Sequence, residues 1–175
     1  VASAQMGGKL QLIDPKPIRF ELLQYKQKKT PLKYPGKVLA DEKTNRLYIT
    51  DSNHNRIVIT TLDGKLLDII GSGQIGRKDG SFAQCSFDHP QGVALHNDTL
   101  YIADTENHML RKADLKTKRV TTICGTGEQG RNPWPNYRLG KPNGKRRNFL
   151  TKPKGYAINS PWALWDHKDN LYIAM

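Results

Sequence analysis

Two aspartates and two histidines are the residues whose types and spacing could perform chemistry in this sequence. Asp51 and Asp104 each end a short apolar stretch, and carboxylates in such places can transfer protons or bind metal ions. His54 and His108 follow them, but no further ligand stands at the spacing that a metal site requires. Because both aspartates precede a hydroxyl residue at matching positions, we expect them to accept backbone N–H bonds in Asx-turns that fix hairpins. We therefore predict no catalytic residue, no metal ligand and no cofactor.

Two glycine-rich segments, residues 71–76 and 125–130, have the Gly-x-Gly-x-x-Gly spacing of dinucleotide-binding loops. In that motif a helix begins directly after the loop, so that the pyrophosphate meets the helix N-terminus. The residues that follow here are Arg-Lys-Asp-Gly and Arg-Asn-Pro-Trp-Pro, and neither run begins a helix. We interpret both segments as structural turns in which Gly71 and Gly125 adopt positive φ.

The net charge of +12 on 175 residues is concentrated in two segments. Residues 16–37 carry +6 and residues 138–154 carry +7, which leaves −1 for the rest of the chain. The second segment is rich in Pro and Gly and predicts an extended surface loop. It is either a solvated insertion or a site that binds an acidic protein or nucleic acid. The candidate residues for binding an anion or a partner are Arg138, Lys141, Lys145, Arg146, Arg147, Lys152 and Lys154, with Trp134 and Tyr137 as aromatic residues able to stack on bases.

The composition argues against two other classes of protein. The longest apolar runs hold four or five residues, far short of the roughly 20 that a membrane-spanning helix needs. Cys85 and Cys124 are too few for a disulfide-dense scaffold or a zinc cluster, and we expect both to be reduced. The first ten residues lack the apolar segment of a signal peptide, which favours a cytoplasmic location.

A repeated pattern defines the elements that must position these residues. A proline-containing stretch followed by an apolar stretch occurs three times, with offsets of 55 and 71 residues between the prolines. Runs of Val, Ile, Leu, Tyr and Thr between turn residues predict four short strands in each of the first two copies. The second strand of every copy is apolar at nearly all positions, which predicts burial on both faces between stacked neighbours. In the third copy Met175 stands where the aspartate is expected. The expected strands are 37–41, 46–50, 56–61 and 65–70 in the first copy, and 92–96, 99–103, 109–114 and 119–124 in the second.

The pattern Pro-x-Gly-Val-Ala followed by Leu-Tyr-Ile-Ala-Asp-Thr-x-Asn-His resembles the NHL repeat, over about residues 33–175. The resemblance implies β-propeller blades, which are four-stranded antiparallel meanders. Residues 77–82, 87–92 and 103–108, and residues 159–162 with 172–175, are similar to a subgroup in which a thioredoxin-like domain precedes the propeller. The chain has no Cys-x-x-Cys, so the resemblance implies no redox activity. The residues expected in structural turns of the repeat are Asp51, Asp104, Asn107, His108, Gly71 and Gly125.

The repeats divide the chain into an N-terminal arm, residues 1–32, and an NHL-repeat propeller segment, residues 33–175. The arm contains an alternating stretch at 18–24 that could close a propeller ring as a strand. The propeller segment comprises a blade at 33–76, a blade at 88–130, a basic insertion at 131–159 and a truncated blade at 160–175. Because a propeller ring has at least four blades, we expect an incomplete ring. Further chain after Met175 is the favoured way to complete it, and self-association through open blade faces is the other.

Three functions remain open from the residues and the resemblance. The first is a non-enzymatic scaffold that binds a protein partner within a larger multidomain protein, which is the role of most NHL propellers. The second is binding of single-stranded RNA or another polyanion through the basic segments. The third is part of a six-bladed hydrolase or lyase, which would need histidine or acidic side chains converging on the propeller axis.

Overall fold

A computed structural model describes residues 31–130 and 153–175, which belong to one compact unit, Pro31–Met175. The predicted ring-closing stretch at 18–24 lies outside the described residues, as does nearly all of the predicted arm. The described chain is all-β apart from two single-turn 3-10 helices, η1 (Ser52–His54) and η3 (Pro153–Gly155). Every pairing between its strands is antiparallel, which confirms the predicted fold class.

The first blade is a four-stranded meander in sequence order. Its strands are β1 (Pro35–Asp41), β2 (Arg46–Asp51), β3 (Arg56–Thr60) and β4 (Leu66–Ile70). Each strand lies within two residues of its predicted bounds. This agreement follows from the dense β-branched and aliphatic residues of the strands and from the turn residues that separate them.

The second blade repeats this meander with β6 (Pro90–His96), β7 (Thr99–Asp104), β8 (Met109–Asp114) and β9 (Arg119–Cys124). A fifth strand, β5 (Gly80–Ser81), pairs with β9 from the connection between the blades. Two residues are too few for a strand pattern, so the sequence does not predict β5. The third copy is a hairpin of β10 (Ala163–His167) and β11 (Asn170–Ala174). Two complete blades and part of a third are therefore present.

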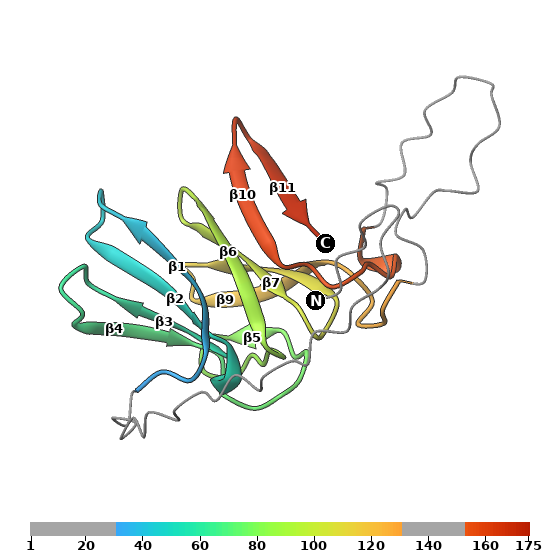
Figure 1. The fold of residues 1–175 in the computed structure, drawn as a ribbon, viewed down its shortest axis with the longest axis horizontal. Coiled ribbons are helices and arrows are strands. Elements are labelled where there is room, and N and C mark those ends of the chain that lie inside the picture. The colour runs from blue at the N-terminus through green and yellow to red at the C-terminus, as the bar shows by residue number, and fades with distance from the viewer. Residues whose placement is uncertain (1–30, 131–152) are drawn as a thin grey trace, which may run out of the picture. The chain divides into compact units, whose positions relative to one another are not determined.

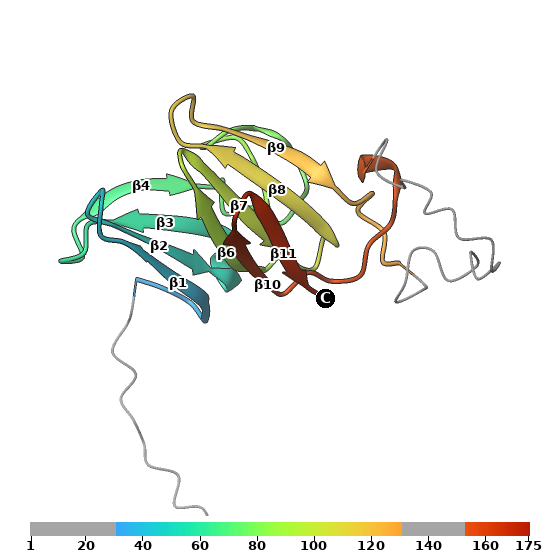
Figure 2. The ribbon, with the colours of Figure 1, turned by 90° about the horizontal axis from the view of Figure 1, so that it is seen from above.

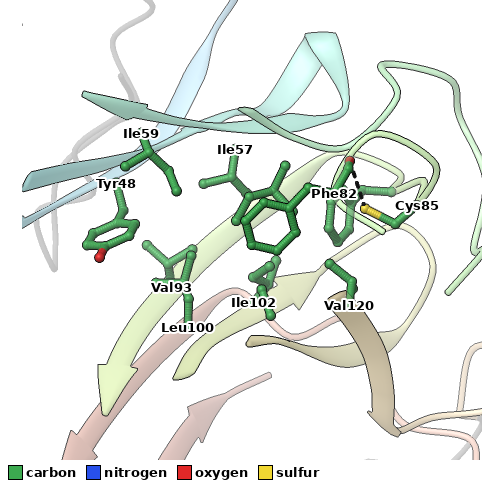
Figure 3. Packing of buried hydrophobic residues seen from close by; sticks show 12 residues of the cluster. Tyr48, Ile57, Ile59, Phe82, Cys85, Val93, Leu100, Ile102 and Val120 are labelled. Carbon is green, nitrogen blue, oxygen red and sulfur yellow. Dashed lines mark hydrogen bonds between the residues drawn. The ribbon is translucent and has the colours of Figure 1, made fainter. Parts of the chain in front are cut away.

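The first strands of the three blades, β1, β6 and β10, lie next to one another although each belongs to a separate sheet (Figures 1 and 2). The facing sides of the first and second blades enclose the main core. There Tyr48, Ile57 and Ile59 from the first blade meet Val93 and Ile102 from the second (Figure 3). The burial of these aliphatic and aromatic side chains between two sheets fixes their separation and register.

A second core forms in the same way between the second and third blades, from Ala94, Ala103, Leu110 and Leu164. The second blade is thus covered on both sides, and the predicted burial of its second strand is confirmed in β7. The same prediction is wrong for β11, whose residues are mostly exposed. The reason is that no strand pairs beyond it and no blade covers its outer face in the described chain.

Candidate functional site

Asp51, at the end of β2, is fully buried, and its carboxylate contacts three groups that reach it from neighbouring segments. Its Oδ1 accepts the backbone N–H of Lys33 at 2.6 Å. Its Oδ2 accepts Nε–H of Arg56 at 2.8 Å and lies 2.8 Å from Nδ1 of His54. The carboxylate therefore ties the loop before β1 to the start of β3.

Asp104, at the end of β7, repeats this arrangement in the second blade. Its Oδ1 accepts the backbone N–H of Asp88 at 2.8 Å, and its Oδ2 accepts Nδ2–H of Asn107 and Nη1–H of Arg111 at 2.9 and 2.7 Å. The prediction that both aspartates form Asx-turns is wrong. Each accepts a backbone N–H, but from a loop 18 or 16 residues earlier, and the turn that follows each aspartate is closed by backbone hydrogen bonds of its own.

Arg111 on β8 is a buried residue of this site that sequence reasoning missed. Its side chain is fully buried and donates to Asp104, to Oδ1 of Asp79 at 2.9 Å and to the carbonyls of Lys78 and Ser86. The guanidinium also lies 5.3 Å from the ring centroid of Phe87, within cation–π range. The alternation of side chains along β8 could have predicted this burial, because Arg111 lies on the same face of the strand as Met109 and Ala113.

The titratable groups around Arg111 have shifted pKa values. Burial raises the pKa of Asp104 to about 6, against the opposing effects of its donors and of the Arg111 charge. Burial also opposes ionisation of Asp79, but hydrogen bonds from Thr122 and the charge of Arg111 outweigh it and lower the pKa of Asp79. Burial raises the pKa of Cys85 to about 11, which leaves it a thiol with no nucleophilic character at neutral pH. Both cysteines are free, as predicted.

The residues after each aspartate join neighbouring blades. Ser52 Oγ–H donates to the carbonyl of Pro90, and Thr105 Oγ1–H donates to the carbonyl of Pro161, both at 2.7 Å. These are equivalent bonds, one from the first blade to the second and one from the second to the third. His108 adds a contact of 3.0 Å between its Nδ1 and Oγ of Ser160 on the third copy. The repeat signature is thus a set of polar contacts that fix the blades together.

The glycine-rich segments are close-packed turns. Gly71 has φ +111° and Gly125 has φ +95°, a region that side chains of L-residues rarely adopt. The strand β5, and no helix, follows the first segment. The geometry that holds a dinucleotide pyrophosphate is therefore missing there. The last residue of each segment is hydrogen-bonded to the chain just before the next blade. The N–H of Gly76 donates to the carbonyl of Phe87, and the N–H of Gly130 donates to the carbonyl of Ile158.

The predicted anion-binding residues are mostly outside the described residues. Of that set the structure places Lys154, which is exposed in η3. Within residues 31–130 and 153–175, no group of three His, Cys, Asp or Glu side chains could hold a metal ion. In the same residues no helix is long and apolar enough to cross a membrane.

A groove of about 720 Å³ opens where the β1–β2 and β6–β7 hairpins lie side by side. Leu39, Ala40 and Leu95 give it an apolar lining, while Glu42 and Asp98 are exposed acidic residues along it. Leu39 and Leu95 also pack against the main core, so the lining is anchored to the rigid part of the fold.

His96, at the end of β6, links the second blade to the third. Its Nδ1 lies 2.9 Å from Oδ2 of Asp166 on β10, and its Nε2 lies 3.6 Å from Oδ1 of Asp169. The hydrogen bond and the charge of Asp166 raise the pKa of His96 above its ordinary value. A raised histidine pKa stabilises the fold below pH 6.5, and this stabilisation disappears as the pH rises through the raised value.

We therefore expect the wild-type chain to lose a small part of its thermal stability between pH 6 and pH 8 relative to His96→Gln, because the pair is partly exposed to solvent. The raised pKa of Asp104 also lowers stability as the pH rises, but it does so equally in both proteins and therefore cancels in the comparison. Melting curves followed by circular dichroism at the two pH values measure the difference. Parallel pH profiles for the two proteins would contradict a stabilising ion pair at this contact.

Four-stranded antiparallel meanders that stack face to face, with their first strands adjacent, are the blades of a β-propeller. The described chain is a segment of that class of protein.

The NHL repeat family matches residues 87–112, which contain β6, β7 and the aspartate site of the second blade. The chain is 43% identical over 133 residues to NHL repeat-containing protein 2 of Gallus gallus, covering 76% of this chain and 16% of that protein. It is 48% identical over 101 residues to NHL repeat-containing protein 2 of Homo sapiens, covering 58% of this chain and 14% of that protein. This chain therefore contains an NHL repeat and is similar to these curated relatives, of whose length it spans about a sixth.

Solved structures support the fold. A structural genomics protein of unknown function from Bacteroides thetaiotaomicron superposes with a TM-score of 0.62. The match covers 80% of this chain and 32% of the other, at 22% sequence identity. At that identity the likeness concerns the fold alone.

Proposed function

We propose that this chain is a non-enzymatic scaffold that binds a protein partner, as part of a larger protein. The observation that supports this proposal best is the groove between the β1–β2 and β6–β7 hairpins. It combines apolar side chains with exposed groups of both charges, Glu42 and Lys43 among them, on a two-blade support, which suits an extended peptide or loop with aliphatic and polar side chains. Proteins of the NHL-repeat family commonly bind other proteins, which supports the same role.

The alternative of a hydrolase or lyase has less support. The repeated aspartates accept bonds from backbone and side-chain donors within their own blades, so neither is available to a substrate. His108 contacts Ser160, and His96 is paired with Asp166. Within the described residues these acidic and histidine groups act in packing the blades, and we propose no catalytic role for them.

Substitution in the groove tests the scaffold proposal. Glu42→Arg places a long cation on its exposed lining and should reduce capture of bound proteins by tenfold or more in a quantitative pull-down. Glu106→Arg is the matched control, because Glu106 is also an exposed acidic residue but lies outside the groove. Equal capture by both variants, or no protein enriched by the wild-type chain, would argue against a scaffold that uses this groove.

Polyanion binding is the second candidate, favoured by the seven basic and no acidic residues of 138–154. Replacing Lys145, Arg146 and Arg147 with Glu should weaken binding to single-stranded RNA at least tenfold, and wild-type binding should fall steeply with salt. A filter-binding titration at two salt concentrations measures both effects. Absent binding, or binding insensitive to salt, would eliminate this candidate.

Deleting the basic segment tests whether a loss of RNA binding comes from the loss of these residues or from a loss of folding. The hydrogen bond between Gly130 N–H and the Ile158 carbonyl ties the two ends of residues 131–157 together at 3.0 Å. The equivalent connection after the first blade, residues 77–86, has 10 residues, and removing residues 138–152, which keeps η3, leaves 12 in the longer one. The deletion variant should therefore fold like the wild-type chain, so that any loss of RNA binding belongs to the basic segment.

A further inference from the structure

Asp88 and His89 form a carboxylate–imidazole pair directly before β6. Oδ1 of Asp88 lies 2.6 Å from Nδ1 of His89, and the two side chains are 24% and 37% exposed. The pair stands at the start of β6, so it lies at the other end of this strand from the groove. The second blade has a neighbouring blade on each side in the described chain, and the exposure of the pair is therefore not that of a terminal blade face.

The backbone of this pair is fixed by contacts from two blades. The N–H of Asp88 donates to the buried carboxylate of Asp104, and its carbonyl accepts the N–H of Glu106 at 3.2 Å. The N–H of His89 donates to Oδ1 of Asn55, in the first blade, at 3.0 Å. His89 also has a left-handed φ of +46°, which is uncommon for a residue other than glycine. These contacts from distant parts of the sequence hold the imidazole in a defined place.

The repeat does not require a carboxylate and an imidazole here. In the first copy Lys33 and Tyr34 stand at the equivalent places before the proline of β1. The N–H of Lys33 reaches the buried Asp51 in the same way, and Tyr34 has the same left-handed conformation, with φ +49°. The folding of the blade therefore accounts for the backbone of this site and not for its two side chains.

The carboxylate determines which imidazole nitrogen is available for chemistry. Because Oδ1 of Asp88 is an acceptor, Nδ1 of His89 carries the proton and Nε2 carries the lone pair. Among the residues that the structure describes, Nε2 of His89 has no hydrogen-bond partner. An imidazole that is oriented by a carboxylate and has an accessible Nε2 lone pair is a base and a nucleophile.

The other four histidines of the chain lack this combination. His96 has a carboxylate near each ring nitrogen, and His108 contacts a serine hydroxyl through Nδ1. His54 shares its aspartate with an arginine and a backbone N–H, and His167 stacks on a tryptophan ring. His89 is therefore the histidine whose carboxylate serves the imidazole alone within the described chain.

We propose that Nε2 of His89 is a nucleophile that accepts an acyl group from an uncharged acyl donor. Nε2 attacks the carbonyl carbon, the bond from this carbon to the leaving group breaks with its electron pair, and the Nδ1 proton passes to Asp88. Anionic phosphoryl donors are disfavoured, because Asp88 is part of the site and the exposed Glu106 adjoins its backbone. The site does not include the groove, so the proposal is independent of the scaffold function.

Diethyl pyrocarbonate tests the proposal on the full 175-residue chain, with peptide mass spectrometry following each of its five histidines. His89 should be modified before the other four, including the more exposed His167. Asp88→Ala should slow the modification of His89 by about tenfold, since it releases Nδ1. Glu106→Ala is the matched control, because it removes an exposed carboxylate next to this backbone and should leave the rate unchanged. Potassium phosphoramidate should not modify His89.

Three results would contradict the proposal. A rate at His167 or His54 above that at His89 would mean that exposure alone controls the reaction. An Asp88→Ala variant that reacts like the wild-type chain would show that the carboxylate does not activate the imidazole. Phosphorylation of His89 by phosphoramidate would contradict the selection of uncharged donors. Melting curves of each variant show whether it is folded, and Asp88→Asn, which keeps an acceptor for Nδ1, should react at a rate between those of Asp88→Ala and the wild-type chain.

Discussion

Arg111→Val should lower the free energy of unfolding by about 3–5 kcal/mol, because it leaves the carboxylate of Asp104 buried without its cation. The side chains of both residues are fully buried, and Nη1 of Arg111 lies 2.7 Å from Oδ2 of Asp104. Asp79 and two backbone carbonyls lose donors in the same variant. Urea unfolding followed by tryptophan fluorescence measures the change.

The pH dependence of the loss identifies the buried charge as its cause. With Arg111 present, burial already raises the pKa of Asp104 to about 6, and loss of the guanidinium should raise it further. A carboxyl with a raised pKa in the folded state destabilises the fold increasingly as the pH rises from the unfolded-state pKa to the folded-state pKa, and fully above the latter. The deficit of Arg111→Val should therefore be smaller at pH 5 than at pH 7.5. An equal deficit at both pH values would assign the effect to lost packing.

The first blade supplies a matched rescue. It carries Arg56 and Val58 at the positions where the second blade carries Met109 and Arg111. Arg56 reaches its own buried aspartate with Nε at 2.8 Å. Adding Met109→Arg to Arg111→Val should therefore recover part of the lost stability, since it transfers the arrangement of the first blade to the second. Recovery should be incomplete because Arg56 has no equivalent of the bond to Asp79.

The strands of the two complete blades could be predicted from the sequence because their signals are local. Alternating β-branched and aliphatic residues, separated by turn residues, are sufficient to define β1 to β4 and β6 to β9. The short strand β5 has no such pattern and depends on pairing with β9, whose partner residues lie 38 to 40 positions later in the chain. The exposure of β11 likewise depends on what covers the blade, which no local pattern contains.

The residues of the two aspartate sites could likewise be predicted only in part from local sequence. Their positions after the apolar strands predict structural roles for Asp51 and Asp104, but the loops whose backbone N–H groups reach them lie 18 and 16 residues earlier. Arg111 stands beside the exposed Lys112, and composition cannot distinguish a buried cation from a solvated one. Only the alternation of β8, which places Arg111 in line with Met109 and Ala113, contained that information.

Gly125→Ala is the second substitution with a large expected effect, a loss of about 2–4 kcal/mol in the free energy of unfolding. Gly125 has φ +95°, and a Cβ there would overlap the carbonyl oxygen of His108 and lie 2.9 Å from Cα of Met109. Because these are backbone atoms of β8 and its preceding turn, no side-chain rotation relieves the overlap. Chemical unfolding of the purified variant measures the loss.

Gly64 separates the two causes of that loss. It has φ +92°, nearly the same as Gly125, but a Cβ at Gly64 would meet nothing within 4 Å. Gly64→Ala therefore introduces the backbone strain alone and should cost about 1 kcal/mol. The difference between the two variants is the cost of pushing the turn after β9 away from the start of β8. If both variants lost the same stability, the close approach at Gly125 would have no energetic weight, and its glycine would serve only the positive φ of the turn.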